Sequence, residues 1–156
     1  MNCNNQKNKN ENKNENKDNF NASLSESSRS ITVLMVDDEE IWLMTGELLL
    51  KDSGYKLIKA NGGIAALEYL SDNMDTIDII LLDLMMPDID GLNVLHEIKK
   101  NERLAKIPVI LQSSISEGSE IEKAYEMGIV SNIKKPYTKN VMINEIKKYC
   151  KTWYNY

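Results

Sequence analysis

Cysteine and proline are scarce in this chain: its 156 residues include two cysteines, Cys3 and Cys150, and three prolines. Two cysteines at opposite ends offer no disulfide framework, which is typical of a protein from a reducing compartment. The first residues lack the apolar stretch of an export signal, and no run approaches the roughly 18 apolar residues of a membrane span. We therefore expect a cytoplasmic protein with no membrane partner.

An excess of positive charge is also absent, because 19 basic residues stand against 24 acidic ones and give a net charge of -5. This balance disfavours nucleic acid and anionic membrane surfaces as the main partner. With 42% hydrophobic residues, the chain can bury one ordinary core and has little room for a second domain.

Apolar residues are nearly missing from the first segment, where Asn, Lys and Glu repeat as MNCNNQKNKNENKNENKDN before Phe20. Such a composition cannot bury enough apolar surface to offset the entropy lost on ordering. We expect residues 1–29 to form a disordered tail and residues 30–156 to form the domain. A tail that binds a partner is the alternative to a compositional bias without function, and we favour the bias.

From Ser30 onward, short apolar runs alternate with segments of helical periodicity. The runs that predict strands are 31–36, 55–60, 77–82, 108–112 and 129–133. Several are apolar at consecutive residues, as in strands that are buried on both faces. The alternation predicts an α/β protein of five βα units, with a parallel sheet covered by helices on both sides.

The segments between these runs carry apolar residues spaced three and four apart, which predicts amphipathic helices. The apolar faces of the first three are formed by Ile41, Met44 and Leu48, by Ala66, Leu67 and Leu70, and by Leu92, Leu95 and Ile98. Segment 117–127 predicts a fourth helix. A fifth follows Thr138, a favourable N-cap residue, with the apolar positions Met142, Ile146, Tyr149, Cys150 and Trp153.

Polar side chains come directly after four of the predicted strands. Because ligands bind at the carboxyl ends of parallel strands, we expect these residues to share one rim of the sheet. They are Asp37, Asp38, Asp83, Ser113, Ser114 and Lys135. Three ionised carboxylates held close together repel one another unless a cation lies between them, and Mg²⁺ is a hard, oxygen-seeking ion that suits such a cluster.

Asp83 is the residue of this rim with the chemistry of a nucleophile. A carboxylate beside a metal ion and the ammonium of Lys135 can be approached by an anionic phosphoryl group and can form an aspartyl phosphate. Lys135 would neutralise charge on the phosphoryl oxygens, and the Ser113 hydroxyl would donate a hydrogen bond to one of them.

Four blocks of the sequence, VLMVDDEE, IILLDLMMPDIDG, PVILQSS and YEMGIVSNIKKPY, resemble the signature blocks of the response regulator receiver domain, in the same order. The separations also match that family: 45 residues from Asp38 to Asp83, 30 more to Ser113 and 22 more to Lys135. The resemblance covers residues 30–156. It implies the flavodoxin-like, doubly wound fold, with five parallel strands in the order 2-1-3-4-5.

The resemblance also implies a role for each residue of the rim. Asp83 would accept a phosphoryl group from a histidine kinase or a histidine phosphotransfer protein. Lys135 would contact that group, and Ser113 would be the switch hydroxyl. The Mg²⁺ ligands would be Asp37, Asp38, Asp83 and the backbone carbonyl of Met85. Pro136 would follow a cis peptide bond.

Some positions depart from the family pattern. Asn132 stands where an aromatic partner of the switch hydroxyl is frequent, and Ser114 where a small Ala or Gly is frequent. We expect the surface of the fourth helix, fifth strand and fifth helix to report the phosphate through backbone movement more than through ring burial. The resemblance implies that Met85 and Ile115 occupy positions that tune phosphate lifetime in the family, and neither can position an attacking water, which predicts slow self-dephosphorylation.

Simpler interpretations exist for single motifs. Asp37 and Asp38 alone would be an N-cap of the first helix, and PDIDG alone would be a turn in which Gly91 supplies a positive φ. Trp42 and Trp153 are explained either by helix packing or as exposed anchors for a partner. The convergence of Asp37 and Asp38 with Asp83 and Lys135 favours the metal site over the cap.

Three functions compete. The first is a stand-alone receiver of two-component signalling, not an enzyme, whose own surface binds a target, since no output domain follows the last helix before Tyr156. The second is a phosphorelay intermediate that passes the phosphoryl group to another histidine. The third is a Mg²⁺-dependent phosphohydrolase of the haloacid-dehalogenase type. That enzyme needs its nucleophile on the first strand, whereas Asp83 follows the third.

Overall fold

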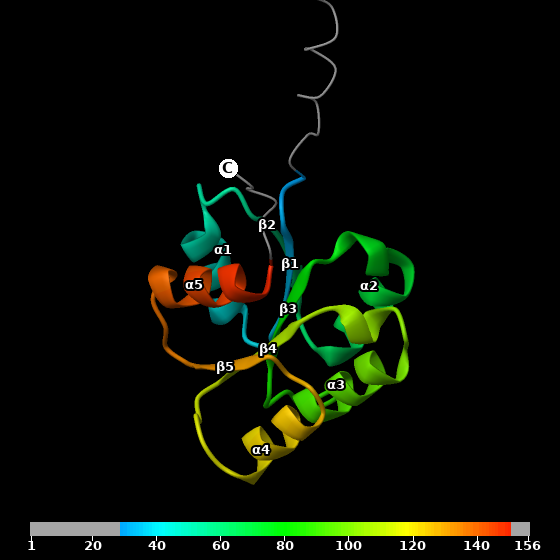
Figure 1. Ribbon diagram of the computed structural model, residues 1–156. Coiled ribbons are helices and arrows are strands. Elements are labelled where there is room, and N and C mark those ends of the chain that lie inside the picture. Colours follow the sequence, from blue (N-terminus) through cyan, green and yellow to red (C-terminus); the bar gives the residue numbers. More distant parts are fainter. Residues whose placement is uncertain (1–28, 151–156) are drawn as a thin grey trace, which may run out of the picture.

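The computed structural model describes residues 29–150 and contains one parallel sheet with helices on both sides (Figure 1). The strands are β1 (Thr32–Val36), β2 (Lys56–Ala60), β3 (Ile79–Asp83), β4 (Val109–Ser113) and β5 (Ser131–Lys134). Their order is β2-β1-β3-β4-β5, and every neighbouring pair is parallel. The flavodoxin-like order expected from the resemblance is therefore confirmed.

Within residues 29–150, four α-helices and two short 3-10 helices connect the strands, and a fifth α-helix follows β5. They are α1 (Glu40–Leu50), α2 (Gly63–Asn73), η1 (Met74–Thr76), α3 (Gly91–Lys100), η2 (Leu104–Lys106), α4 (Ser119–Glu126) and α5 (Lys139–Tyr149). Helices α1 and α5 cover one face of the sheet, and α2, α3 and α4 lie on the other (Figure 1). Thr138 is the N-cap of α5, as the sequence predicts, and its side chain accepts a hydrogen bond from the Val141 backbone.

Two apolar clusters hold these layers together, one on each face of the sheet. Alternate residues of a strand point to opposite faces, so Met35 of β1 belongs to the cluster under α1 and α5, while its neighbour Leu34 belongs to the other. Strands β1, β3 and β4 are buried along their whole length. This two-sided burial explains why these strands are apolar at consecutive positions.

The apolar face predicted for the first helix is wrong. Ile41, Met44 and Leu48 are 62%, 55% and 69% exposed, and the side that packs on the sheet carries Leu43 and Leu50.

The reason for this orientation is the small residue Gly46, which is also buried in α1. A Cβ on Gly46 would lie 2.2 Å from the sulfur of Met35 in β1. The helix axis therefore lies close to the strand, and only the side of α1 with the glycine can face it.

Near the edges of the described region, the structure differs more from the predictions made from the sequence. The strand expected over 129–133 begins at Ser131, because the Ile129 backbone N–H still donates to Ala124 of α4. The expected tail lies outside the described residues except for Arg29, whose guanidinium pairs with Asp78. Cys3 and Trp153 also lie outside them. Among residues 29–150, no helix has the length and apolar character that crossing a membrane requires.

Candidate acidic site at the carboxyl rim of the sheet

The ends of four strands bring their last polar side chains to one side of the sheet. Each of these residues continues the row of apolar side chains that faces α1 and α5. Val33 and Met35 are followed by Asp37, Ile79 and Leu81 by Asp83, Ile110 by Gln112, and Ile133 by Lys135. Because this alternation has a period of two residues, the four polar groups form the next layer above the apolar cluster.

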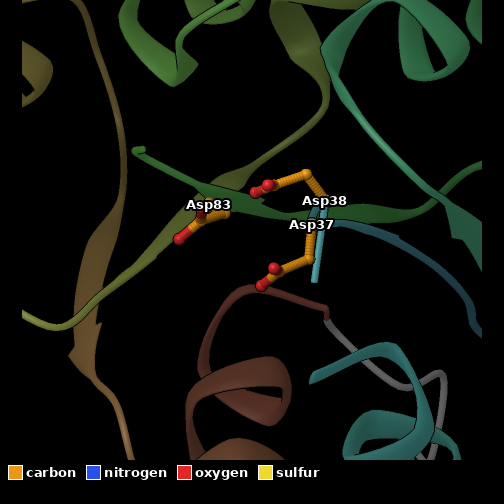
Figure 2. Close-up of side chains that lie close together, drawn as sticks. All are labelled: Asp37, Asp38 and Asp83. Atoms are coloured by element: carbon orange, nitrogen blue, oxygen red, sulfur yellow. The ribbon is translucent and has the colours of Figure 1, made fainter. Parts of the chain in front are cut away.

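Three carboxylates meet at this rim of the sheet, two of them from this layer and the third from Asp38 (Figure 2). Asp37, Asp38 and Asp83 each offer one oxygen, and these oxygens all lie within 4.8 Å of one another. Asp37 is fully buried and Asp83 is 5% exposed, whereas Asp38 faces solvent. The sequence prediction that these acids converge is confirmed in geometry.

Lys135 bridges the two buried acids. Its Nζ lies 2.5 Å from Oδ2 of Asp37 and 2.9 Å from Oδ1 of Asp83, and the residue is only 7% exposed. The same ammonium lies 4.8 Å from the centroid of the Trp42 ring, where the π face attracts a cation. The Lys135 backbone N–H donates to the Ser113 carbonyl at 2.7 Å, so the ends of β4 and β5 are fixed to each other.

The charge of the site is unbalanced, because one ammonium faces three acids. Burial raises the pKa of Asp83 to about 6, with Lys135 opposing the shift and the charges of Asp37 and Asp38 adding to it. Burial also raises the pKa of Asp37, against the lowering effect of Lys135. The excess negative charge and the oxygen-only donor set are those that a hard divalent cation prefers, so the residues present fit Mg²⁺.

Neither Asp37 nor Asp38 is the N-cap residue of the first helix, so the simpler interpretation as a helix cap does not hold. The N-cap residue of α1 is Glu39, which makes no side-chain capping hydrogen bond. Asp37 does accept a hydrogen bond from the Glu39 backbone through Oδ1, at 3.1 Å. Its second oxygen, Oδ2, is the one that contacts Lys135.

The loop after Asp83 is anchored at two points. The side chain of Asp88 accepts a hydrogen bond from the Ile64 backbone at the start of α2, at 2.9 Å. Asp90 is the N-cap of α3 and accepts one from the Asn93 backbone, also at 2.9 Å. These contacts fix the segment that contains Met85, whose backbone carbonyl was predicted as a metal ligand.

Gly91 has a different role from the one expected in a simple turn. It is not among the residues with positive φ, so the expectation of a positive φ is wrong. A Cβ at this position would lie 2.3 Å from the carbonyl oxygen of Asp83. Glycine is required because the first turn of α3 packs directly on the backbone at the end of β3.

The predicted switch residues lie at the end of β4. Ser113 is 1% exposed, and its Oγ accepts a hydrogen bond from the Ile115 backbone at 3.2 Å. Asn132 of β5 donates through Nδ2 to the Ser116 carbonyl at 3.3 Å, while its Oδ1 is buried without a partner among residues 29–150. Ser114 is exposed. Pro136 follows a cis peptide bond, as predicted.

Sequence reasoning missed two residues of this site, Gln112 and Tyr137. The hydroxyl of Tyr137 donates to Oε1 of Gln112 at 2.5 Å, and Gln112 is completely buried. The available signal was the single polar residue in the otherwise apolar run PVILQ. Trp42, which the sequence left open as a packing residue or an anchor, lies beside Lys135 and Tyr137, and its ring centroid is 6.2 Å from that of Tyr137.

The chain is similar to known signalling proteins. The model of the response regulator receiver domain family matches residues 33–147. The polar-differentiation response regulator DivK of Brucella abortus is 30% identical over 118 residues, which are 76% of this chain and 94% of DivK. The rice two-component response regulator-like protein PRR37 is 32% identical over 116 residues, 74% of this chain but only 16% of PRR37.

Solved structures give the same fold. The Vibrio cholerae chemotaxis protein CheY4 superposes with a TM-score of 0.73 at 19% identity, over 78% of this chain and 100% of CheY4. A CheY-like receiver domain protein from Methanospirillum hungatei gives a TM-score of 0.70 at 20% identity, over 77% and 93% of the two chains. At these identities the likeness concerns the fold alone.

Proposed function

The chain belongs to the response regulator receiver domain family, and we propose that it is a signalling switch in which Asp83 accepts the phosphoryl group. The observation that carries this proposal is the position of the Asp83 carboxylate, 2.9 Å from the Lys135 ammonium and close to two further acids. Asp83 is also the last residue of the central strand β3. A rigid strand end holds a nucleophile in a fixed direction, which favours transfer to it.

The proposed step is a transfer from phosphohistidine. A carboxylate oxygen of Asp83 attacks the phosphorus, a P–O bond forms, and the P–N bond breaks with its electron pair left on the imidazole nitrogen. The carboxylate must be ionised for this attack. With a pKa of about 6, Asp83 is mostly ionised at neutral pH.

A magnesium ion would be held by Asp37, Asp38 and Asp83 together with the backbone carbonyl of Met85. When bound, it supplies positive charge that offsets the repulsion between the carboxylates and the incoming phosphoryl oxygens. The carboxylates have the oxygen donors and the mutual proximity that this ion requires. The residues of this chain would thus supply the ligands for the cation, and the cation together with Lys135 would offset the negative charge of an incoming phosphoryl group.

Lys135 would change partners when the phosphoryl group arrives. In the present structure its ammonium is shared between Asp37 and Asp83. Formation of the acyl phosphate removes the negative charge from Asp83 and places new negative oxygens beside it. The ammonium then pairs with a phosphoryl oxygen, an interaction strengthened by its burial.

We propose that Ser113 transmits this change. Its Oγ is bonded to the Ile115 backbone N–H at the start of the loop between β4 and α4. If the hydroxyl turns to donate to a phosphoryl oxygen, Ile115 loses its acceptor and the loop has to move. The hydrogen bond from Asn132 to Ser116 ties this loop to β5, so the movement reaches the face formed by α4, β5 and α5.

The partners proposed from the site are a histidine kinase or phosphotransfer protein as donor and a target protein on the α4, β5 and α5 face. That the receiver acts alone stays a prediction. Some relatives, such as DivK, match this chain over most of their own length, whereas others, such as PRR37, match it over a small part of theirs. A phosphorelay intermediate is the second candidate. The observation that favours it concerns Met85 and Ile115, whose apolar side chains are 66% and 38% exposed and would slow hydrolysis of the phosphoryl group.

Incubation with acetyl phosphate and Mg²⁺ tests the proposal. We expect one acid-stable, base-labile phosphoryl group per chain, mapped by mass spectrometry to Asp83 and missing from the Asp83→Asn variant. Asp72→Asn, at an exposed position of α2, is the matched control and should be phosphorylated normally. A phosphoryl group on another residue, or repeated turnover of small phosphoesters as in a phosphohydrolase, would contradict the proposal.

A further inference from the structure

Gln112 is a buried amide near the carboxyl end of β4. It lies on β4, in register with Asp83 of β3 and Ile133 of β5, and it is completely inaccessible to solvent. Residues in register on parallel strands point to the same face, so its side chain shares the polar layer of Asp37, Asp83 and Lys135. A buried amide is costly unless its oxygen and its N–H groups are bonded.

The hydrogen bonds of Gln112 connect two parts of the site. Its Nε2 lies 3.4 Å from Oδ2 of Asp37 and 3.4 Å from the carbonyl oxygen of Val36. Its Oε1 accepts the hydrogen bond from the Tyr137 hydroxyl at 2.5 Å. One side chain therefore spans from the end of β1, which the predicted metal ligand Asp37 follows, to the segment after Lys135.

The direction of these bonds is determined by charge. If the Gln112 amide were turned over, Oε1 would face the carboxylate of Asp37, and two acceptors would repel each other. The Tyr137 hydroxyl favours the observed orientation by donating to Oε1. Burial raises the pKa of Tyr137, and the charges of Asp37 and Asp83 add to the shift, so this hydroxyl keeps its proton at neutral pH.

The carboxylate of Asp37 gains a neutral donor from this arrangement. Its Oδ1 is held by the Glu39 backbone, and its Oδ2 is shared by Lys135 and Gln112. When Lys135 turns to a phosphoryl group, Oδ2 loses its charged partner. The Gln112 amide remains as a donor that keeps the carboxylate pointed into the site.

We propose that Gln112 and Tyr137 are positioning residues of the metal site: the amide of Gln112 orients Asp37, and the hydroxyl of Tyr137 fixes the amide. The inference rests on the proposed function, since it assumes that Asp37 binds Mg²⁺. Hydrogen-bond partners behind a metal ligand typically change metal affinity about 10–100-fold when they are removed. Tyr137 acts through Gln112, so the two residues should not contribute independently.

The test is a Mg²⁺ titration of Gln112→Met and Tyr137→Phe, which remove the polar contacts and keep the side-chain volume. Trp42 fluorescence reports binding in a Trp153→Phe background, where Trp42 is the remaining tryptophan, and calorimetry checks the dissociation constants. We expect affinity about tenfold weaker for Gln112→Met and somewhat less weakened for Tyr137→Phe. The double variant should be no weaker than Gln112→Met alone.

A second readout separates positioning from general damage to the fold. If the two residues act by orienting Asp37, saturating Mg²⁺ should restore the rate of phosphorylation by acetyl phosphate in both variants. Tyr125→Phe, at a half-exposed tyrosine of α4, is the matched control and should leave affinity unchanged. If Gln112→Met does not fold, Tyr137→Phe decides, because it removes a single oxygen.

Three results would overturn the inference. They are Mg²⁺ affinities within about twofold of the parent for both variants, losses that add in the double variant, or a rate that stays low at saturating Mg²⁺. Failure of the parent protein itself to bind Mg²⁺ would instead contradict the proposed function. The two failures are therefore distinguishable in one set of titrations.

Discussion

The ammonium of Lys135 lies 2.9 Å from the carboxylate of Asp83, in a region where both residues are almost fully buried. Low solvent exposure strengthens this pair but also makes each uncompensated charge costly. With Asp37 and Asp38 close by, the single ammonium cannot balance the acids. Four predictions follow from this imbalance and from the residues around it.

Mg²⁺ affinity should fall as the pH is lowered through the pKa of Asp83. That pKa is raised to about 6, so below this pH a proton competes with the cation for the carboxylate. We expect the apparent affinity to decrease about tenfold per pH unit below pH 6 and to level off above neutrality. Titrations between pH 5 and 8 measure this dependence, and an affinity that is constant over the range would contradict it.

Asp83→Asn should stabilise the metal-free protein at high pH. The folded-state pKa of Asp83 lies above its ordinary value of 3.8, so the folded protein binds this proton more tightly than the unfolded chain does. The free energy of unfolding therefore falls as the pH rises from about 4 through 6 and is level above. The amide of the Asp83→Asn variant cannot ionise, so the variant avoids this decrease in the free energy of unfolding.

The expected gain is on the order of 2 kcal/mol at pH 8 and close to zero at pH 4. Urea denaturation in the presence of a chelator measures it at both values. Asp72→Asn, on the surface of α2, should show no such difference between the two pH values. A gain of equal size at pH 4 would argue against the ionisation of Asp83 as its source.

Lys135→Met should slow phosphorylation by acetyl phosphate without weakening Mg²⁺ binding. The variant keeps the length and apolar stem of the side chain but removes the charge that meets the phosphoryl oxygens. Loss of such a stabilising group typically costs about 10²–10³ in rate. Mg²⁺ affinity should not fall, because the ammonium and the cation neutralise the same acids.

The adjacent Lys134 provides the control for this variant. Lys134 is exposed, so Lys134→Met changes the net charge equally without touching the acids. It should be phosphorylated at the normal rate. Equal losses in the two variants would mean that net charge, and not contact with Asp83, determines the rate.

The phosphorylated protein should lose its phosphoryl group slowly. Met85 and Ile115 are exposed near the site and offer no group that orients a water molecule. Met85→Gln and Ile115→Gln should each shorten the lifetime, because an amide can hold water near the phosphorus. Decay of the radiolabelled phosphoryl group measures it, with Val141→Gln, an exposed apolar position on α5, as control. A half-life of seconds in the unsubstituted protein would refute the prediction.

Much of the fold could be predicted because it follows from local spacing. The run from Ile79 to Leu82 is apolar at consecutive residues, as a strand covered on both faces must be, and the helices between the strands require crossover connections of one hand. With the strands parallel, their last residues had to meet at one rim. The convergence of Asp37, Asp38 and Asp83 follows from that argument.

Helix α1 shows where local spacing is insufficient. Its sequence EIWLMTGELLL is apolar on more than one side, so a spacing of three and four residues fits both Ile41, Met44 and Leu48 and the side that is buried. The choice between them depends on how closely the helix axis can approach β1. Gly46 and Met35 determine that distance, and they become neighbours only in the folded chain.

Periods of two and 3.6 residues along the chain were enough to predict the five βα units and the rim on which the acids meet, and the residue types at that rim are read directly from the sequence. Tertiary structure alone decided which face of α1 is buried, that Gly91 packs against the Asp83 carbonyl, and that Gln112 joins Asp37 to Tyr137. Those outcomes depend on contacts between residues that are distant along the chain, and no local pattern encodes such distances.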